Sequence, residues 1–178
     1  MMKEEYYYWP ADLLARYVVK AHHREIRRRL PEIKAGFVQL VAIYGDHNPE
    51  LRQAHTLFLQ CAAEMEAHFS KEGTIVLMYA RRYQKELMKP KELRKPGLYS
   101  VCPSIHKMYL EHKMERLCFD WLFGLLRQVT IPAKESYLYE TTYQQLYELR
   151  GQWRAQVQLE NDVLFPKIIE MEAILDPL

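Results

Sequence analysis

The chain has 178 residues, of which 49% are hydrophobic and 27% are charged. That length suits one domain with a full hydrophobic core and is too short for two, so we expect a single domain over residues 1–178. The formal net charge of +2 gives no electrostatic reason to expect binding to nucleic acid or to an anionic membrane surface.

The N-terminus indicates a protein that is neither secreted nor anchored in a membrane. It carries charges and tyrosines where a secretory signal needs an apolar segment, and no stretch approaches the roughly 20 apolar residues of a membrane span. We therefore expect a soluble, cytoplasmic protein. Cys61, Cys102 and Cys118 lack CxxC spacing and indicate neither a disulfide framework nor a thiolate zinc site. We interpret Cys61 and Cys118 as small core residues.

The apolar residues follow helical spacing almost throughout, and no sustained alternation marks a strand, so the sequence predicts an all-α fold. The first helix should open at Pro10, a favoured first-turn residue, and run to about Tyr44 with a kink at Pro31. We expect three more helices, from 49 to the middle 80s, from 103 to about 129 and from 137 to about 168. The proline-broken segment 89–103 is a long crossover between helices two and three. Together these helices predict an antiparallel up-down four-helix bundle.

Each predicted helix has a core stripe in steps of three and four residues, because residues at those steps share one face. In the first helix the stripe is Val19, His23, Ile26, Leu30, Ile33, Phe37 and Leu40. In the second it is Leu57, Cys61, Met65, His68, Glu72, Ile75 and Tyr79. In the third it is Ile105, Met108, His112, Glu115, Phe119, Leu122 and Leu126. In the fourth it is Leu146, Leu149, Trp153, Gln156, Glu160 and Val163.

The polar members of these stripes should lie at one level of the bundle. His23 and His68 are each about 22 residues from the first turn, so an antiparallel hairpin with a rise of about 1.5 Å per residue sets them side by side. The same count about the last turn places His112 opposite Gln156 and Glu160. His22, about 100° around the helix from its neighbour, should lie nearer the edge.

Several buried histidines and carboxylates at one level favour a metal site. A single histidine on an apolar face is more often a hydrogen-bonded core residue than a ligand, and Glu72 or Glu160 could pair with Arg27 or Arg116 instead. The core stripes contain no lysine or arginine, however, so the clustered carboxylates would keep an unneutralised negative charge. A pair of cations neutralises that charge best. Oxygen and imidazole ligands without thiolate suit iron, manganese or zinc.

The order His-x-x-x-Glu in "HFSKE" resembles the hemerythrin-like di-iron proteins, in particular the family called repair of iron centres (RIC), which repairs iron-sulfur clusters. The small N-terminal domain with paired cysteines that many members carry is not expected here, because the chain begins almost at the first bundle helix. The matching stretches are "RYVVKAHHREIRRRLPEI", "GDHNPEL", "EMEAHFSKE", "MYLEHKME" and "LENDVLFP".

The resemblance implies two iron ions bridged by carboxylates. The implied metal ligands are His23, His68, Glu72, His112 and Glu160. Gln156 falls where the family has a further histidine, and a neutral amide is a poorer iron ligand than imidazole, so one iron should be bound more weakly. Glu115, one turn beyond His112 on the core stripe, is a candidate replacement carboxylate.

The resemblance also implies the leading functional hypothesis, a cytoplasmic di-iron protein of nitrosative or oxidative stress that helps repair damaged iron-sulfur clusters. Its expected partners are nitric oxide or dioxygen and iron-sulfur client proteins, with no nucleic acid and no membrane. The alternatives are a sensor or carrier of dioxygen, nitric oxide or iron without turnover, and a helical interaction protein whose metal site has decayed. Whether the protein is an enzyme stays open, and we expect a monomer or a homodimer.

Overall fold

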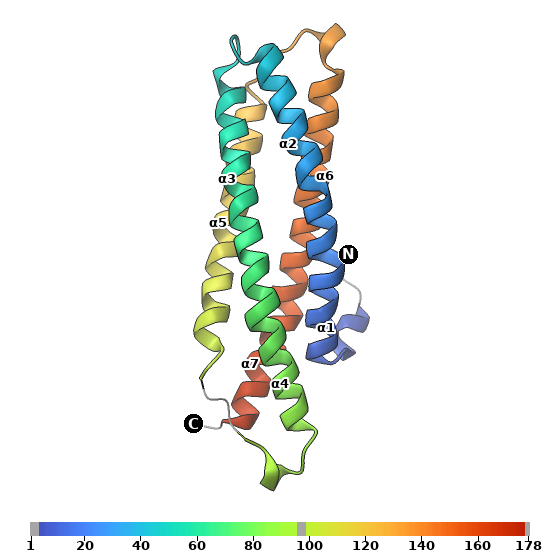
Figure 1. Cartoon of the computed structure of the whole chain (residues 1–178), viewed down its shortest axis with the longest axis vertical. Coiled ribbons are helices and arrows are strands. Elements are labelled where there is room, and N and C mark those ends of the chain that lie inside the picture. The colour runs from blue at the N-terminus through green and yellow to red at the C-terminus, as the bar shows by residue number, and fades with distance from the viewer. Residues whose placement is uncertain (1–3, 96–98, 177–178) are drawn as a thin grey trace.

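The computed structural model describes residues 4–95 and 99–176, and it arranges them as an elongated antiparallel four-helix bundle (Figure 1). No strand occurs among these residues, which confirms the all-α prediction. We call the four continuous helical runs rods. They consist of α1 (Ala11–Tyr17), η2 (Val18–His23) and α2 (Arg24–Tyr44); α3 (Pro49–Lys71), η3 (Glu72–Val76) and α4 (Leu77–Leu87); α5 (Cys102–Leu126); and α6 (Tyr137–Leu159), η6 (Glu160–Leu164) and α7 (Phe165–Leu175).

The rods differ from the predicted helices mainly at their ends. The third rod stops at Leu126 rather than near Val129, and the fourth continues past Ile168 to Leu175. Pro31 lies inside α2, whose helical backbone continues through it. Short 3-10 turns cover Glu4–Tyr8, Lys91–Leu93 and Ala133–Glu135. The predicted crossover 89–103 connects α4 to α5, and its residues 96–98 lie outside the described part of the chain.

Side-chain hydrogen bonds tie the connections at both ends of the bundle. At one end the Asn48 amide donates to the Tyr44 carbonyl over 3.1 Å, and its oxygen accepts from the Thr130 backbone N–H over 2.8 Å. At the other end the Glu172 carboxylate accepts from the Val101 backbone N–H over 2.9 Å and from the Tyr83 hydroxyl over 3.0 Å. These bonds satisfy polar groups that would otherwise be left unpaired where the rods turn.

The core consists of two apolar clusters, one toward each end of the bundle. One contains Leu14, Ala80, Ile105 and Phe165, and the other contains Phe37, Phe58, Phe119 and Leu149. Between them lies a layer of buried polar side chains that interrupts the hydrophobic core. That polar layer consists of His23, His68, Glu72, His112, Glu115, Gln156 and Glu160.

The helices carry three π-helical segments, η2, η3 and η6, and they explain why parts of two predicted stripes are wrong. A π turn closes hydrogen bonds from i to i+5, so it inserts about one extra residue and shifts the buried face beyond it. Val18 is buried in place of Val19. Val76 and Ala80 are likewise buried in place of Ile75 and Tyr79, which pack only at the edge of the core.

A simpler one-residue error affects the second rod before any π turn, since Phe58 is buried and Leu57 lies at the core edge. The predicted stripes of the third and fourth rods are buried throughout. At Gly36, α2 approaches α6 closely, because a Cβ there would collide with the Thr142 hydroxyl.

The basic run in the first rod makes ion pairs within the chain. Arg27 pairs with Glu66 over 2.7 Å, and Arg29 pairs with Glu148 over 2.8 Å. Because Arg27 pairs with Glu66, it does not take the role of ion-pair partner of Glu72 that was the alternative to a metal ion. Among the described residues, no helix has the length and apolar character needed to cross a membrane.

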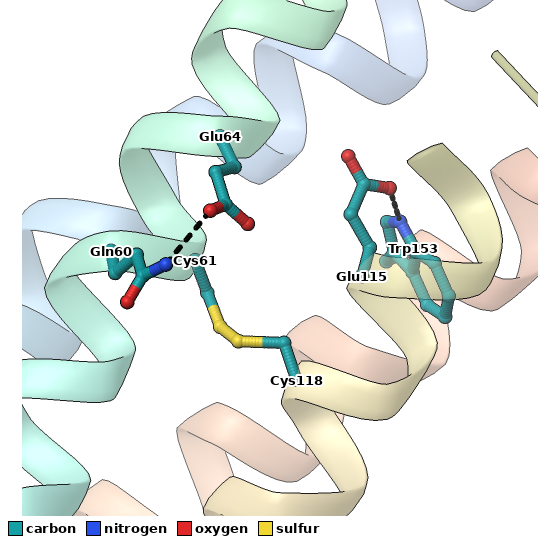
Figure 2. The surroundings of a disulfide bond; sticks show 6 residues. All are labelled: Gln60, Cys61, Glu64, Glu115, Cys118 and Trp153. Carbon is teal, nitrogen blue, oxygen red and sulfur yellow. Dashed lines mark hydrogen bonds between the residues drawn. A yellow bond between two sulfur atoms is a disulfide. The ribbon is translucent and has the colours of Figure 1, made fainter. Parts of the chain in front are cut away.

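Cys61 of α3 and Cys118 of α5 are joined by a disulfide (Figure 2). Their burial agrees with the sequence interpretation, but reading them as unlinked core residues was wrong. Spacing along the chain could not reveal the pairing, because the two residues are 57 positions apart and meet only when α3 packs against α5.

Breaking this disulfide should destabilise the bundle. For a closed loop of this size the chain-entropy relation gives a loss of about 4 kcal/mol in the free energy of unfolding. We expect reductant to lower the midpoint of chemical denaturation of the parent chain, while a Cys61→Ala/Cys118→Ala double variant stays insensitive to reductant. Equal midpoints for the parent with and without reductant would contradict this expectation.

Candidate metal centre

Four ligand-type side chains from three rods converge in the polar layer. One ligand atom from each of His68, Glu72, His112 and Glu160 lies within 4.8 Å of those of the other three, and all four residues are buried. His68 and Glu72 are one turn apart at the junction of α3 and η3. His112 comes from α5, and Glu160 is the first residue of η6.

The π-helical segments lie at the candidate ligands. His23 is the last residue of η2, Glu72 is the first of η3 and Glu160 is the first of η6. Such segments are rare and are frequently found at functional sites. A π turn has poorer hydrogen-bond geometry than an α turn, but it changes the direction in which the following side chains point. In this bundle each π turn keeps a polar residue pointing inward while the apolar face beyond it still packs on the core.

The rings of His68 and His112 face each other with their Nε2 atoms 3.1 Å apart. The other nitrogen of each ring, Nδ1, points away from this meeting point. His68 Nδ1 lies 2.9 Å from a Glu111 oxygen, and His112 Nδ1 lies 2.9 Å from the Asn161 amide oxygen. Those oxygens accept hydrogen bonds, so they favour the tautomer with the proton on Nδ1. Two neutral rings would then aim two Nε2 lone pairs at one point, which requires a cation or a proton there.

Two carboxylates of the polar layer, Glu72 and Glu160, lack hydrogen bonds that their burial demands within the described part of the chain. Glu72 accepts from His23 Nε2 over 2.9 Å with one oxygen, and its other oxygen lies 3.4 Å from His68 Nε2 without forming a hydrogen bond. Glu160 lies 3.2 Å from His112 Nε2, yet neither of its oxygens has a hydrogen-bond partner among the described residues. Leaving a buried carboxylate unpaired costs several kcal/mol, and metal coordination removes that cost.

Protons partly replace the missing charge in the metal-free protein. Burial lowers the pKa of His68, but the adjacent Glu72 carboxylate more than offsets this and raises it to about 10. Burial raises the pKa of Glu72, but the hydrogen bond with His23 and the nearby His68 imidazole more than offset this and lower it to about 2. Burial and the negative charge of Glu72 raise the pKa of Glu160 well above its usual value. These shifts favour a protonated His68 at neutral pH, and they make Glu160 easier to protonate than an ordinary glutamate.

These residues fit a metal site. Unpartnered carboxylate oxygens and facing imidazole nitrogens are the ligand types that suit iron, manganese or zinc. His68 has the carboxylate of Glu111 behind it, and Lys71 pairs with that carboxylate in turn. Such partners behind a metal-binding histidine fix its ring and raise its basicity. The assignment of these residues as ligands stays a prediction.

Three further sequence-predicted residues lie around this group of four. His23 is buried, stacks on Phe69 at 4.2 Å between ring centres and reaches the group through Glu72. Gln156 is buried with its amide oxygen lacking a hydrogen-bond partner in the described chain. His22, as expected, is only half-buried and packs its ring edge-on against Tyr17.

Glu115 is buried as expected, but it has a different partner. Its carboxylate accepts from the Trp153 indole N–H over 2.8 Å, as Figure 2 shows, and the other oxygen lies 3.9 Å from His68 Nδ1. It therefore faces the outward nitrogen of His68 rather than the inward Nε2. Burial raises its pKa. The structure does not bring Glu115 into the group of four.

The sequence analysis missed Glu111 and Asn161. Each is the immediate neighbour of a predicted ligand, His112 and Glu160 respectively, so it lies about 100° away from the core stripe on the helical wheel. A search restricted to that stripe therefore passes over them. They could have been found by looking for a polar residue directly beside a predicted ligand, on the side of the helix that faces the next helix of the bundle.

Comparison with known families matches residues 14–168 to the family described as Hemerythrin HHE cation binding domain. The matched region includes every candidate ligand and most of each rod. A comparison with curated proteins finds no match.

The neighbouring histidines provide a matched pair of variants. We expect His23→Ala to lower the metal content of the purified protein clearly, because a bound ion would lose an imidazole ligand. His22→Ala should leave the metal content unchanged, since this ring packs on Tyr17 at the edge of the rod. Metal analysis of both folded variants tests this. Equal losses would show that the helical register around η2 is wrong.

Metal binding should release protons, because His68 and Glu160 must give up theirs to become ligands. At neutral pH we expect about one proton per chain from His68, with a further contribution from Glu160, and an affinity that rises with pH. Glu160→Gln should remove the Glu160 contribution. Calorimetric titration with Fe²⁺ under anaerobic conditions, in buffers of different ionisation enthalpy, measures this number. Binding whose heat is independent of the buffer would contradict the protonation states given above.

Proposed function

The chain belongs to the hemerythrin HHE cation-binding domain family, and from that premise we propose that its polar layer binds two iron ions bridged by Glu72 and Glu160. One observation carries the proposal most directly. His68 and His112 direct their Nε2 atoms at one point, beside three buried carboxylate oxygens that lack hydrogen-bond partners. A single proton cannot satisfy all of these acceptors, whereas two divalent cations can.

The two irons should not be held equally. As the resemblance to hemerythrin-like proteins implies, His23 and His68 would hold one ion, and His112 with Gln156 would hold the other. The second ion has a neutral amide where the resemblance expects an imidazole, so it has one strong ligand fewer. The outer support differs as well, since His68 is backed by the charged Glu111 and His112 by the neutral Asn161. Both differences predict that the second iron is the labile one.

We infer that the protein acts in the repair of iron-sulfur clusters damaged by nitric oxide or oxidants, as its resemblance to the RIC family suggests. Bound iron would supply open coordination positions for a diatomic ligand and a change of oxidation state. The chain contributes the surroundings. The apolar clusters on either side of the polar layer exclude bulk water, and His68 and Glu160 take up the protons that metal release requires. A labile second iron suits a protein that delivers iron to a client.

We place this activity in the cytoplasm, and the disulfide bears on that proposal. Glutathione and thioredoxin keep most cytosolic thiols reduced, so Cys61 and Cys118 would spend most of their time there as a dithiol. Oxidative stress would close the bond between α3 and α5. The stabilising cross-link would then form under the conditions in which the protein is needed.

A carrier of iron or nitric oxide without turnover is the second candidate, and the same site supports it. A third candidate, an interaction protein with a decayed metal site, rests on Gln156 alone. The remaining group of four ligand-type residues argues against decay. Without a metal ion, buried oxygens of Glu72 and Glu160 in this group have no hydrogen-bond partner among the described residues.

The test is repair of a nitric-oxide-inactivated [4Fe–4S] dehydratase by the iron-loaded chain under anaerobic conditions. We expect the loaded parent and His22→Ala to restore the activity of the dehydratase, and Glu160→Gln to fail because it lacks a bridging carboxylate. Consumption of nitric oxide, followed with an electrode, separates turnover from binding alone. Equal repair by the metal-free parent would overturn the proposal.

A further inference from the structure

The third rod, α5, has apolar residues on two opposite faces. Its inner face packs into the bundle at Met108, His112, Phe119 and Leu122. Its outer face exposes four large apolar side chains, which we call the outer stripe. The outer stripe consists of Leu110, Met114, Leu117 and Trp121, which are 41% to 66% exposed.

The residues of the outer stripe are regularly spaced, whereas exposed apolar residues on most proteins are scattered singly. Its members follow one another at intervals of four, three and four residues, which is the spacing of successive d and a positions in a coiled coil. At 100° per residue all four fall within an arc of about 60°, nearly opposite the buried face of α5. Single exposed apolar residues need no explanation, but an aligned stripe of this kind marks an interaction surface.

We propose that the outer stripe is the contact through which two copies of this chain associate, with their α5 helices antiparallel across a twofold axis. In that arrangement Leu110 faces Trp121 of the second copy and Met114 faces Leu117. Each contact occurs twice, because a twofold interface is built from the same patch on both subunits.

The charges beside the outer stripe favour a second copy in this orientation. Lys113 and Asp120 are exposed, lie seven residues apart on the same flank and stand almost symmetrically about the middle of the outer stripe. Asp120 also lies 3.8 Å from the Arg150 guanidinium of its own chain, but half of its side chain stays exposed. The antiparallel pairing sets Lys113 beside Asp120 of the second copy, and the reverse, giving two opposite-charge pairs. A parallel pairing would set Lys113 beside the buried Cys118 and Asp120 beside Leu125, which pairs neither charge.

The surface beside the outer stripe can accept the largest side chain of the contact. A groove of about 430 Å³ runs between α3 and α5, and Ala67, Leu110 and Met114 contribute its apolar lining. Because Leu110 faces Trp121 of the second copy, the indole would enter this groove. Tryptophan in such a pocket is a frequent centre of binding energy at protein interfaces.

The contact is short, since the outer stripe spans about 16 Å of helix, and this predicts a dimer that dissociates on dilution. Sedimentation equilibrium of the full chain from low to high micromolar concentration should show the mass rising from 21.4 kDa toward twice that value. Trp121→Ala should stay monomeric over the same range, with an unchanged helical circular dichroism spectrum because this residue lies outside the core.

Charge reversal tests the orientation. Lys113→Glu and Asp120→Lys should each raise the dissociation constant about tenfold, because each turns two attractive pairs into repulsive ones. The double variant Lys113→Glu/Asp120→Lys should recover most of the parent affinity, since it exchanges the two signs across the interface and otherwise loses only the contact of Asp120 with Arg150. A parent chain that is monomeric at every concentration would overturn the proposal. A dimer indifferent to both single reversals and to Trp121→Ala would overturn it as well.

Discussion

The buried charge in the middle of the bundle is the constraint on which the rest of this structure depends. Three carboxylates, three imidazoles and one amide occupy the polar layer that separates the two apolar clusters. Among the described residues, lysine and arginine are absent from that layer, so the protein has no fixed positive charge there to offset Glu72 and Glu160. A proton on His68, and the raised pKa of Glu160, reduce this charge, and cations would neutralise the rest.

The backbone shows the same constraint. An uninterrupted α-helix would direct either the ligand-type residue or the apolar residues beyond it away from the core. The π turns at His23, Glu72 and Glu160 remove this conflict by adding about one residue to the register. Pro166 lies in the first turn of α7, directly after η6. Proline has no backbone N–H to donate, and this costs little at a point where the π turn already interrupts the α-helical hydrogen bonds. α5 carries a single residue of the group of four, His112, and stays α-helical throughout.

Helical periodicity was enough to predict the four rods, their antiparallel order and the level at which the polar residues meet. It could not predict the π turns, and for that reason it chose Ile75 over Val76 as a core residue. Contacts between distant parts of the chain were equally out of reach. The Cys61–Cys118 disulfide and the Glu111 support of His68 each depend on how α3 packs against α5, which no local spacing records. The sequence placed Glu115 in the core correctly but could not show that Trp153 occupies its carboxylate.

The central claim is that Glu72 and Glu160 together hold a metal pair, and anaerobic titration of Fe²⁺ into the metal-free chain tests it most directly. The account predicts two irons per parent chain, the second bound more weakly, and loss of the pair in both Glu72→Ala and Glu160→Ala. Glu115→Gln, a buried carboxylate outside the group of four, serves as the matched control and should keep both irons. Two irons bound as tightly by either alanine variant as by the parent would contradict the account.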